Sequence, residues 1–163
     1  MIELSRVLIA NRGEIATRIA KAAAALGMES VGIFAPVDAL SLHTKMTTTA
    51  RQLQADSADP VAAYLDGTAL VALAKDSGCD CVHPGYGFLS ENAAFAEQCA
   101  QAGLIFVGPP VPALALFGDK TRARALAASL DIPVIPGSDG PLSSADAAVA
   151  AGRQLGYPVM LKA

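Results

Sequence analysis

The stretch HPGYGFLSEN, residues 83–92, combines an imidazole, a phenol and a carboxylate with two glycines. Glycines permit positive φ angles and close approach of the backbone to a ligand. The stretch follows a short apolar run, so we expect it at the carboxyl end of a strand, the edge at which open parallel sheets bind ligands. His83, Tyr86 and Gly87 are therefore candidates for contact with a ligand.

A purely structural role explains part of the same stretch. Ser90 can cap a helix that runs from Glu91 to about Ala102, and Glu91 would then lie at the positive end of the helix dipole. A capped turn between a strand and a helix accounts for Ser90, Glu91 and one glycine. It requires neither His83 nor Tyr86 nor the second glycine, so a ligand role stays open for these.

Neither of the common glycine-rich phosphate-binding motifs is present. The first predicted strand ends in Asn11-Arg12-Gly13, with one glycine where a dinucleotide-binding turn needs three. The GDKT stretch, residues 118–121, resembles only the tail of a P-loop, because the upstream glycine is missing. We therefore expect neither NAD nor a P-loop nucleotide at these turns.

Two lysines are candidates for binding an anion. Lys120 stands near a predicted helix start, a position that by itself is typical of an exposed lysine. Lys162 follows the apolar residues 159–161 in a predicted strand, where a lysine on the buried side is costly unless it meets an anion such as phosphate. Alternation along the strand does not say which side Lys162 faces, so both roles stay open.

The elements that must position these groups alternate along the first two thirds of the chain. Apolar runs predict strands at residues 7–10, 30–35, 79–83 and 104–107. A helical pattern lies between each strand and the next, and glycines at 27, 78 and 103 end these helices. Residues 36–59 give no clear pattern. Alternating strands and helices predict an α/β fold with a doubly wound, mostly parallel sheet.

Two of these helices carry more detailed predictions. The first should bury one face, made of Ile15, Ile19, Ala22 and Leu26. On its other face Glu14 precedes Arg18 by four residues, the favourable order for an ion pair. We expect this face to be solvated or to contact another subunit. In the second, Asp66 is placed to cap the amino end.

After Val111 the pattern becomes mainly helical. Helices are predicted at residues 111–117 and 119–130, followed by an extended linker at 132–138 and a helix that Ser143 or Ser144 caps. Residues 159–163 predict a strand whose backbone would lack a partner. We therefore expect a fragment, divided near residues 108–118 into the parts 1–110 and 111–163.

Composition narrows the class of protein. The 163 residues are 53% apolar and 17% charged with a net charge of −3, which favours a soluble cytoplasmic protein and offers no basic surface for nucleic acid. No signal peptide and no apolar run of ~20 residues is visible, so we expect no membrane association. The cysteines at 79, 81 and 99 are expected to be reduced and buried rather than metal ligands.

Six motifs together resemble the amino-terminal part of biotin carboxylases. They are ANRGEIATRI (10–19), HPGYGFLSEN (83–92), FVGP (106–109), GDK (118–120), PVIPGSDGPL (133–142) and GYPVMLKA (156–163). Their order and spacing are similar to the family over essentially the whole chain. Such domains occur in acetyl-CoA, propionyl-CoA and other acyl-CoA carboxylases, in pyruvate carboxylase and in urea carboxylase.

The resemblance implies an ATP-dependent ligase of the ATP-grasp superfamily. Such an enzyme phosphorylates bicarbonate and transfers the carboxyl group to N1′ of biotin on a partner domain. The implied fold is a Rossmann-like pre-ATP-grasp domain, a parallel sheet flanked by helices, at residues 1–110. A helical linker and the first elements of an ATP-grasp domain would occupy residues 111–163. The implied cofactors are ATP, Mg²⁺ and carrier-bound biotin.

The same resemblance assigns residues and partners. Lys120 and Lys162 correspond to family lysines that contact ATP phosphates, where a flexible point charge offsets phosphate charge. His83, Tyr86 and Gly87 would lie beside the bicarbonate and biotin pocket.

The implied partners are a biotin carboxyl carrier domain and a carboxyltransferase domain or subunit. A homodimer is a further possibility, because Arg18 and Lys21 lie on a helix that some family members use for dimerisation.

The sequence departs from the family pattern in one stretch, and other parts of the family site would follow this chain. Thr48-Thr49-Ala50 stand where many members have Ala-Asp-Glu. The glycine-rich lid, the metal-binding carboxylates and the bicarbonate-binding arginine of the family would all follow Ala163. We therefore expect no catalytic residue and no metal ligand in this chain, which by itself should be inactive.

Two alternatives to a biotin carboxylase remain. One is another ATP-grasp ligase, such as a carbamoyl-phosphate synthase, but the pairing of ANRGEI with HPGYGFLSEN argues against it. The other is a noncatalytic module for dimerisation or docking, against which Lys120 and Lys162 argue weakly.

Overall fold

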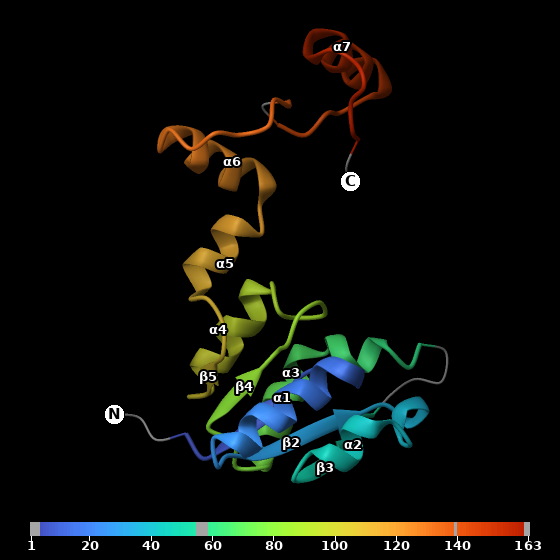
Figure 1. The fold of residues 1–163 in the computed structure, drawn as a ribbon, viewed down its shortest axis with the longest axis vertical. Coiled ribbons are helices and arrows are strands. Elements are labelled where there is room, and N and C mark those ends of the chain that lie inside the picture. Colours follow the sequence, from blue (N-terminus) through green and yellow to red (C-terminus); the bar gives the residue numbers. More distant parts are fainter. Residues whose placement is uncertain (1–3, 55–58, 139, 162–163) are drawn as a thin grey trace. The chain divides into compact units, whose positions relative to one another are not determined.

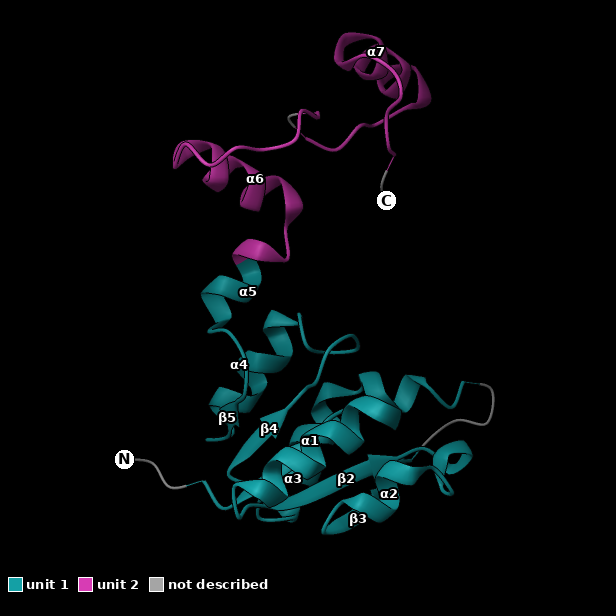
Figure 2. Ribbon diagram, viewed as in Figure 1, with its two compact units in different colours: residues 1–115 teal, residues 116–163 magenta. Residues whose placement is uncertain are grey.

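The structure is a computed structural model, and it describes residues 4–54, 59–138 and 140–161. The chain forms two compact units, residues 1–115 and residues 116–163 (Figure 2). The first unit holds the sheet, and the second holds helices and extended segments.

A parallel sheet of five strands forms the centre of the first unit (Figure 1). Its strands are β1 (Arg6–Ile9), β2 (Glu29–Phe34), β3 (Thr49–Gln52), β4 (Cys81–His83) and β5 (Ile105–Phe106). They lie in the order β3-β2-β1-β4-β5, and every neighbouring pair is parallel. The predicted doubly wound sheet is thus confirmed, and its strand order reverses between β1 and β4.

Helices cover both faces of this sheet. Side chains alternate along β1, so Val7 and Ile9 pack with α1 (Gly13–Ala25) on one face. Leu8 on the other face belongs to the core that includes residues of α3 (Gly67–Asp76) and α4 (Ala93–Gln101). Burial on both faces explains why the strands read as continuous apolar runs.

The buried face of α1 differs from the predicted one. The structure buries Ala16, Thr17, Ile19, Ala20 and Ala23. Of the predicted residues, Ile19 is buried and Ile15 is partly buried against the same cluster, whereas Ala22 is exposed and Leu26 is 77% exposed. Small alanines face the sheet because a helix that lies directly on strands leaves little room beneath its axis. A pattern of large apolar side chains does not reveal such a face.

Residues 36–59 gave no clear pattern, and their described part, 36–54 and 59, contains three further elements. They are a 3-10 helix at Pro36–Asp38, α2 (Leu42–Met46) and β3. β3 is an edge strand with exposed Thr49, Arg51 and Gln52, so it lacks the apolar alternation that marks a strand. A Cβ on Gly32 of β2 would lie 2.7 Å from Oγ1 of Thr47, so this glycine allows the close approach of the α2–β3 connection.

The turn before α4 is two residues longer than predicted. α4 begins at Ala93 and is capped by Asn92, whose side chain accepts a hydrogen bond from the N–H of Phe95 at 2.9 Å. Ser90 instead lies in a turn and donates its N–H to the Gly87 carbonyl at 2.9 Å. The prediction that Ser90 caps this helix, with Glu91 in its first turn, is therefore wrong.

Other predicted caps are found where expected. Asp66 accepts a hydrogen bond from the N–H of Ala69 at the start of α3. Ser144 accepts one from Ala147 at the start of α7 (Ala145–Leu155). These two predictions are confirmed.

The second unit contains little buried surface. Its elements are α6 (Lys120–Ser129) and α7, preceded by α5 (Val111–Phe117), which crosses the division between the units. Arg124 of α6 donates to the Ile135 carbonyl at 2.7 Å and so ties the extended stretch 132–138 to the helix. Gly152 is the one buried residue among those described at 116–161.

The strand predicted at residues 159–163 is absent over its described part. Residues 159–161 form no strand and are exposed. Residues 162 and 163 lie outside the described residues. Over the described ranges, none of the helices is sufficiently long and apolar to cross a membrane.

Candidate functional site

Three loops meet at the carboxyl edge of the sheet, where a doubly wound sheet places its ligands. They follow β1, β2 and β4 and include residues 10–13, 35–38 and 84–88. Side chains from the first loop bond to both of the others, through Asn11 to Pro84 and through Arg12 to Asp38. The stretch HPGYGFLSEN thus occupies the predicted edge.

Asn11 joins the loops on either side of the point where the strand order reverses. Its side-chain amide donates to the carbonyl of Pro84 at 2.7 Å and to that of Tyr86 at 3.0 Å. Its side-chain oxygen accepts from the N–H of Arg12 at 2.9 Å. The residue is 1% exposed, so every polar atom of this buried amide is used within the protein.

The backbone at the first turn of α1 is also hydrogen-bonded within the protein. The N–H of Gly13 donates to Nδ1 of His43 at 3.3 Å, and Nε2 of His43 lies 3.0 Å from the Ile33 carbonyl. His43 is fully buried. The backbone group that would begin a pyrophosphate cradle at this turn is therefore bonded to a side chain of α2.

The two glycines of the loop after β4 serve different purposes. Both have positive φ, +68° for Gly85 and +69° for Gly87. A Cβ on Gly85 would lie 2.6 Å from Cγ2 of Ile15 and 2.7 Å from Nδ2 of Asn11. At Gly87, apart from the residue itself and its two chain neighbours, no described heavy atom lies within 4 Å of the position of a Cβ. Gly85 is therefore needed for packing, whereas the backbone at Gly87 is open to a ligand.

Phe88 follows in a backbone conformation that residues with a side chain rarely adopt. Its φ is +44°, which costs about 1 kcal/mol or more for a residue with a Cβ. Its ring stacks on that of Tyr64, with centroids 5.5 Å apart and planes 6° apart. The buried neighbour Leu89 fixes the chain further along. Packing of these side chains holds the loop in its bent path.

Tyr64 belongs to a buried polar network at the same edge. Its hydroxyl donates to Oδ2 of Asp38 at 2.7 Å and accepts from the N–H of Ala35 at 2.9 Å. Burial raises the pKa of Tyr64 above its usual value, so the hydroxyl keeps the proton that it donates. Arg12 forms an ion pair with Asp38 at 2.8 Å, and its guanidinium lies 5.6 Å from the centre of the Tyr64 ring.

His83 begins the loop as a half-buried imidazole. Its Nδ1 accepts a hydrogen bond from the N–H of Gly85 at 3.0 Å, so the neutral ring carries its proton on Nε2. Burial lowers the pKa of His83 below its usual value, which favours this neutral form. The next aromatic residue, Tyr86, is 70% exposed.

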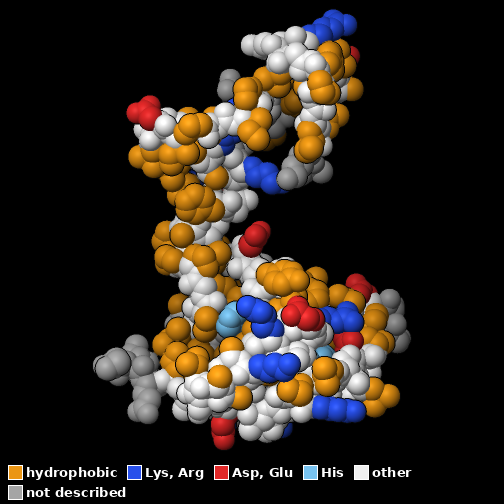
Figure 3. Space-filling model, viewed as in Figure 1, with side chains coloured by type: hydrophobic (Ala, Val, Ile, Leu, Met, Phe, Trp, Pro, Cys, Tyr) orange, Lys and Arg blue, Asp and Glu red, His pale blue; other side chains and the backbone are white. Residues whose placement is uncertain are grey.

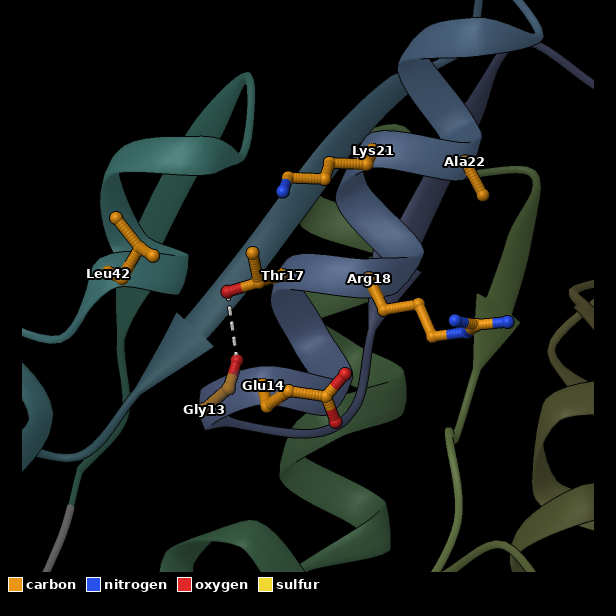
Figure 4. Close-up of a pocket in the computed structure, with 7 residues that line it drawn as sticks. All are labelled: Gly13, Glu14, Thr17, Arg18, Lys21, Ala22 and Leu42. Atoms are coloured by element: carbon orange, nitrogen blue, oxygen red, sulfur yellow. Dashed lines mark hydrogen bonds between the residues drawn. The ribbon is translucent and has the colours of Figure 1, made fainter.

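Two open grooves run along α1. One, of about 740 Å³, is lined by Lys21 of α1 and Leu42 of α2, among others (Figure 4). The other, of about 600 Å³, is mostly apolar and includes His83 and Tyr86 in its lining. Arg18 lines both grooves. The structure thus brings Arg18 to the same groove as two residues of the predicted loop.

The charged side chains of α1 are exposed and spread apart. Figure 4 shows Lys21 extending toward α2 and Arg18 extending in the opposite direction. Glu14 and Arg18, both of which the structure describes, are exposed and form no ion pair with each other, although their spacing allows one. Figure 3 shows charged side chains on the visible face of this helix. A role for Arg18 and Lys21 in dimerisation stays a prediction.

The predicted ATP-binding lysines belong to the second unit. Lys120 is the first residue of α6 and is exposed. Asp119 caps this helix by accepting hydrogen bonds from the N–H groups of Thr121 and Arg122. Lys162 lies outside the described residues.

Among the described residues, no group of three or more His, Cys, Asp or Glu is arranged to hold a metal ion. The cysteines at 79, 81 and 99 are free and buried, as predicted. Burial raises the pKa of each thiol to about 11, so none is a reactive thiolate at neutral pH.

Sequence reasoning missed the residues that support the loop. These are Asn11, Arg12, Asp38, His43 and Tyr64. For Asn11 a signal was present, because a polar residue directly after a buried strand lies at the ligand edge of a parallel sheet. Tyr64 and Asp38 carried no such signal, since the stretch around them was not assigned.

The parallel sheet and the polar loops at its carboxyl edge place the first unit among the Rossmann-like α/β domains. Residues 3–114 match the family model of the biotin carboxylase N-terminal domain. Residues 119–163 match that of the carbamoyl-phosphate synthase L chain, ATP binding domain. The chain belongs to the biotin carboxylase family.

Known proteins and structures agree with this assignment. Pyruvate carboxylase of Staphylococcus aureus is 43% identical over 163 residues, which are 100% of this chain and 14% of that protein. The biotin carboxylase domain of a single-chain bacterial carboxylase is 56% identical with a TM-score of 0.87, covering 97% of this chain and 36% of that one.

A third match is a structure with ligands. It is the biotin carboxylase domain dimer of Hydrogenobacter thermophilus 2-oxoglutarate carboxylase, in complex with MgADP, ADP and bicarbonate. It is 37% identical with a TM-score of 0.89, and the match covers 97% of this chain and 34% of that one. The chain therefore spans about a third, or less, of the length of these relatives.

Proposed function

We propose that this chain forms the amino-terminal part of a biotin carboxylase. The reaction consists of phosphorylation of bicarbonate by ATP, followed by transfer of the carboxyl group to N1′ of biotin on a carrier domain. The observation that carries the proposal is the succession of two family matches, residues 3–114 and 119–163, along one chain. In this role residues 1–110 are the pre-ATP-grasp domain, and residues 111–163 are the linker and the start of the ATP-grasp domain.

The loop after β4 is the proposed substrate side. Tyr86 is exposed, and the backbone at Gly87 is open, so both are accessible to bicarbonate or biotin. Neutral His83 carries its proton on Nε2, the nitrogen that does not accept from Gly85. It therefore offers a donor to an anionic oxygen without adding a charge.

Lys120 and Lys162 are the proposed contacts to ATP phosphates. Lys120 is exposed at the amino end of α6, so its ammonium group and the helix dipole both favour an anion there. Lys162 is assigned by its place in the stretch PVMLKA. The resemblance to biotin carboxylases assigns the Mg²⁺ ligands to regions that the longer relatives carry beyond the matched segment.

The proposed partners are a biotin carboxyl carrier domain and a carboxyltransferase domain or subunit, in the cytoplasm. A second copy of the chain would contact α1 through Arg18 and Lys21. Their exposure supports this, as does the dimer in the Hydrogenobacter structure.

A chimera tests the proposal directly. Residues 1–163 replace the matched segment of Staphylococcus aureus pyruvate carboxylase, and bicarbonate-dependent ATP hydrolysis and carboxylation of biotin are measured. Both activities should be retained, and Lys162→Ala should weaken ATP binding about tenfold, as expected for the loss of a charged phosphate contact. The isolated 163-residue chain should show neither activity.

Other outcomes would contradict the proposal. Bicarbonate-dependent ATP hydrolysis without carboxylation of biotin would favour another ATP-grasp ligase. Unchanged ATP affinity after Lys162→Ala would remove the phosphate contact. A chimera that folds and dimerises but lacks both activities would favour a noncatalytic module.

A further inference from the structure

We infer that Asn11 is a positioning residue, which fixes the backbone of residues 84–87 so that Tyr86 and Gly87 face the biotin. This inference rests on the proposed function of the loop. Its physical basis is the juxtaposition of the Asn11 amide with the Pro84 and Tyr86 carbonyls across the point where the strand order reverses.

The hydrogen bonds of Asn11 leave it a single orientation. Two amide donors reach two carbonyls of the loop, while the side-chain oxygen accepts from Arg12 in the turn after β1. The residue is 1% exposed, so water does not replace these bonds when they are lost. A buried amide with all its bonds made within the protein holds its partners in one geometry.

The loop needs such a hold because its own sequence is permissive. Gly85 and Gly87 both adopt positive φ and carry no side chain that could pack. Gly85 lies directly against Nδ2 of Asn11, with no room for a Cβ. The Asn11 amide therefore supplies the hydrogen bonds at the first half of the loop and, together with Ile15, the surface against which Gly85 packs.

The next residue in the chain holds the second half. Arg12 pairs with Asp38, which accepts from Tyr64, and the Tyr64 ring stacks on Phe88. Residues 11 and 12 of one turn thus secure the loop at both ends. Tyr86 is held through its carbonyl while its side chain is exposed, and the open Gly87 lies between Tyr86 and Phe88.

Asn11→Asp is the discriminating variant. It keeps the size of the side chain and the acceptor for the Arg12 N–H, but it turns two donors into acceptors that face carbonyls. Asn92→Asp is the matched control, because Asn92 uses only its side-chain oxygen, as the cap of α4. Asn11→Ser, which removes the contacts without adding a charge, replaces Asn11→Asp if that variant does not fold.

The first measurement is amide hydrogen exchange in the 163-residue chain. Asn11→Asp should speed exchange about tenfold at Gly85 and Ser90, whose N–H groups are hydrogen-bonded within the loop, because the backbone that aligns these bonds is no longer held. Exchange in α3 and in β1 should stay unchanged, and Asn92→Asp should leave the loop as it is. Unchanged exchange of the loop in Asn11→Asp, or equal acceleration throughout the first unit, would overturn the inference.

The second measurement is steady-state kinetics in the pyruvate carboxylase chimera. Asn11→Asp should raise the KM for free biotin about tenfold while the KM for ATP stays within about twofold. A parallel rise in both KM values would indicate general damage and overturn the positioning role. If the unmutated chimera does not carboxylate biotin, the proposed function fails, and the biotin-facing role fails with it. The exchange result then still decides whether Asn11 holds the loop.

Discussion

At the scale of single residues, the loop after β4 is shaped by the side chain of Asn11 and by the lack of a side chain at Gly85. Asn11 bonds to two of its carbonyls, and Gly85 lets the backbone lie against that amide. Gly87 has the same backbone conformation as Gly85 but no neighbour near its Cβ position. The two glycines therefore separate the effect of backbone strain from the effect of packing.

Gly85→Ala should destabilise the first unit much more than Gly87→Ala. Each substitution costs about 1 kcal/mol for a residue with a Cβ at positive φ. At Gly85 the new methyl group also meets Ile15 and Asn11 below van der Waals distance, which adds about 1–3 kcal/mol. Urea unfolding followed by circular dichroism measures both changes. Equal losses of stability would show that the close packing at Gly85 yields without cost.

Only those residues of the candidate site that lie close together in the sequence could be predicted. His83, Tyr86 and Gly87 stood out because glycines and polar groups follow one strand. Their supports come from three other segments, which are the turn after β1 with Asn11, the turn after β2 with Asp38, and the 3-10 helix Ala62–Leu65 with Tyr64. Contacts between residues 26 to 75 positions apart leave no local pattern, so only the folded chain reveals them.

At the scale of elements, buried strands and capped helices were predictable and edge elements were not. β1, β2 and β4 lie under helices and therefore read as apolar runs. β3 is exposed at the sheet edge, so its residues carry no alternation. The face of α1 was predicted only in part for a related reason, since three of its five buried residues are alanines.

The start of α4 offers a test at this scale. Asn92 caps the helix, whereas Ser90 lies two residues earlier in a turn. Asn92→Ala should therefore lower the free energy of unfolding by about 1 kcal/mol, because the N–H of Phe95 loses its acceptor. Ser90→Ala should change it by less than about 0.5 kcal/mol, since only its backbone is used. The reverse order of losses would restore Ser90 as the cap.

At the scale of the whole molecule, the two units differ in how they are held together. The first unit has apolar clusters on both faces of its sheet. In the second, no residue of α6 is buried, and large apolar side chains such as Ile135, Met160 and Leu161 are at least 74% exposed. Figure 3 shows hydrophobic side chains over much of the visible face of α6 and α7. Hydrophobic burial therefore stabilises the first unit and contributes little to the second.

This difference predicts the behaviour of a shortened chain. Residues 1–117, which end with α5, should unfold cooperatively with the same urea midpoint as the first unit of the 163-residue chain, because the sheet and both apolar clusters lie within them. The full chain should bind the dye ANS through the exposed apolar side chains at 116–161, and the shortened chain should bind much less. Loss of cooperative unfolding on removal of residues 118–163 would mean that the second unit supports the core of the first. Equal dye binding by both chains would place the exposed apolar surface on the first unit instead.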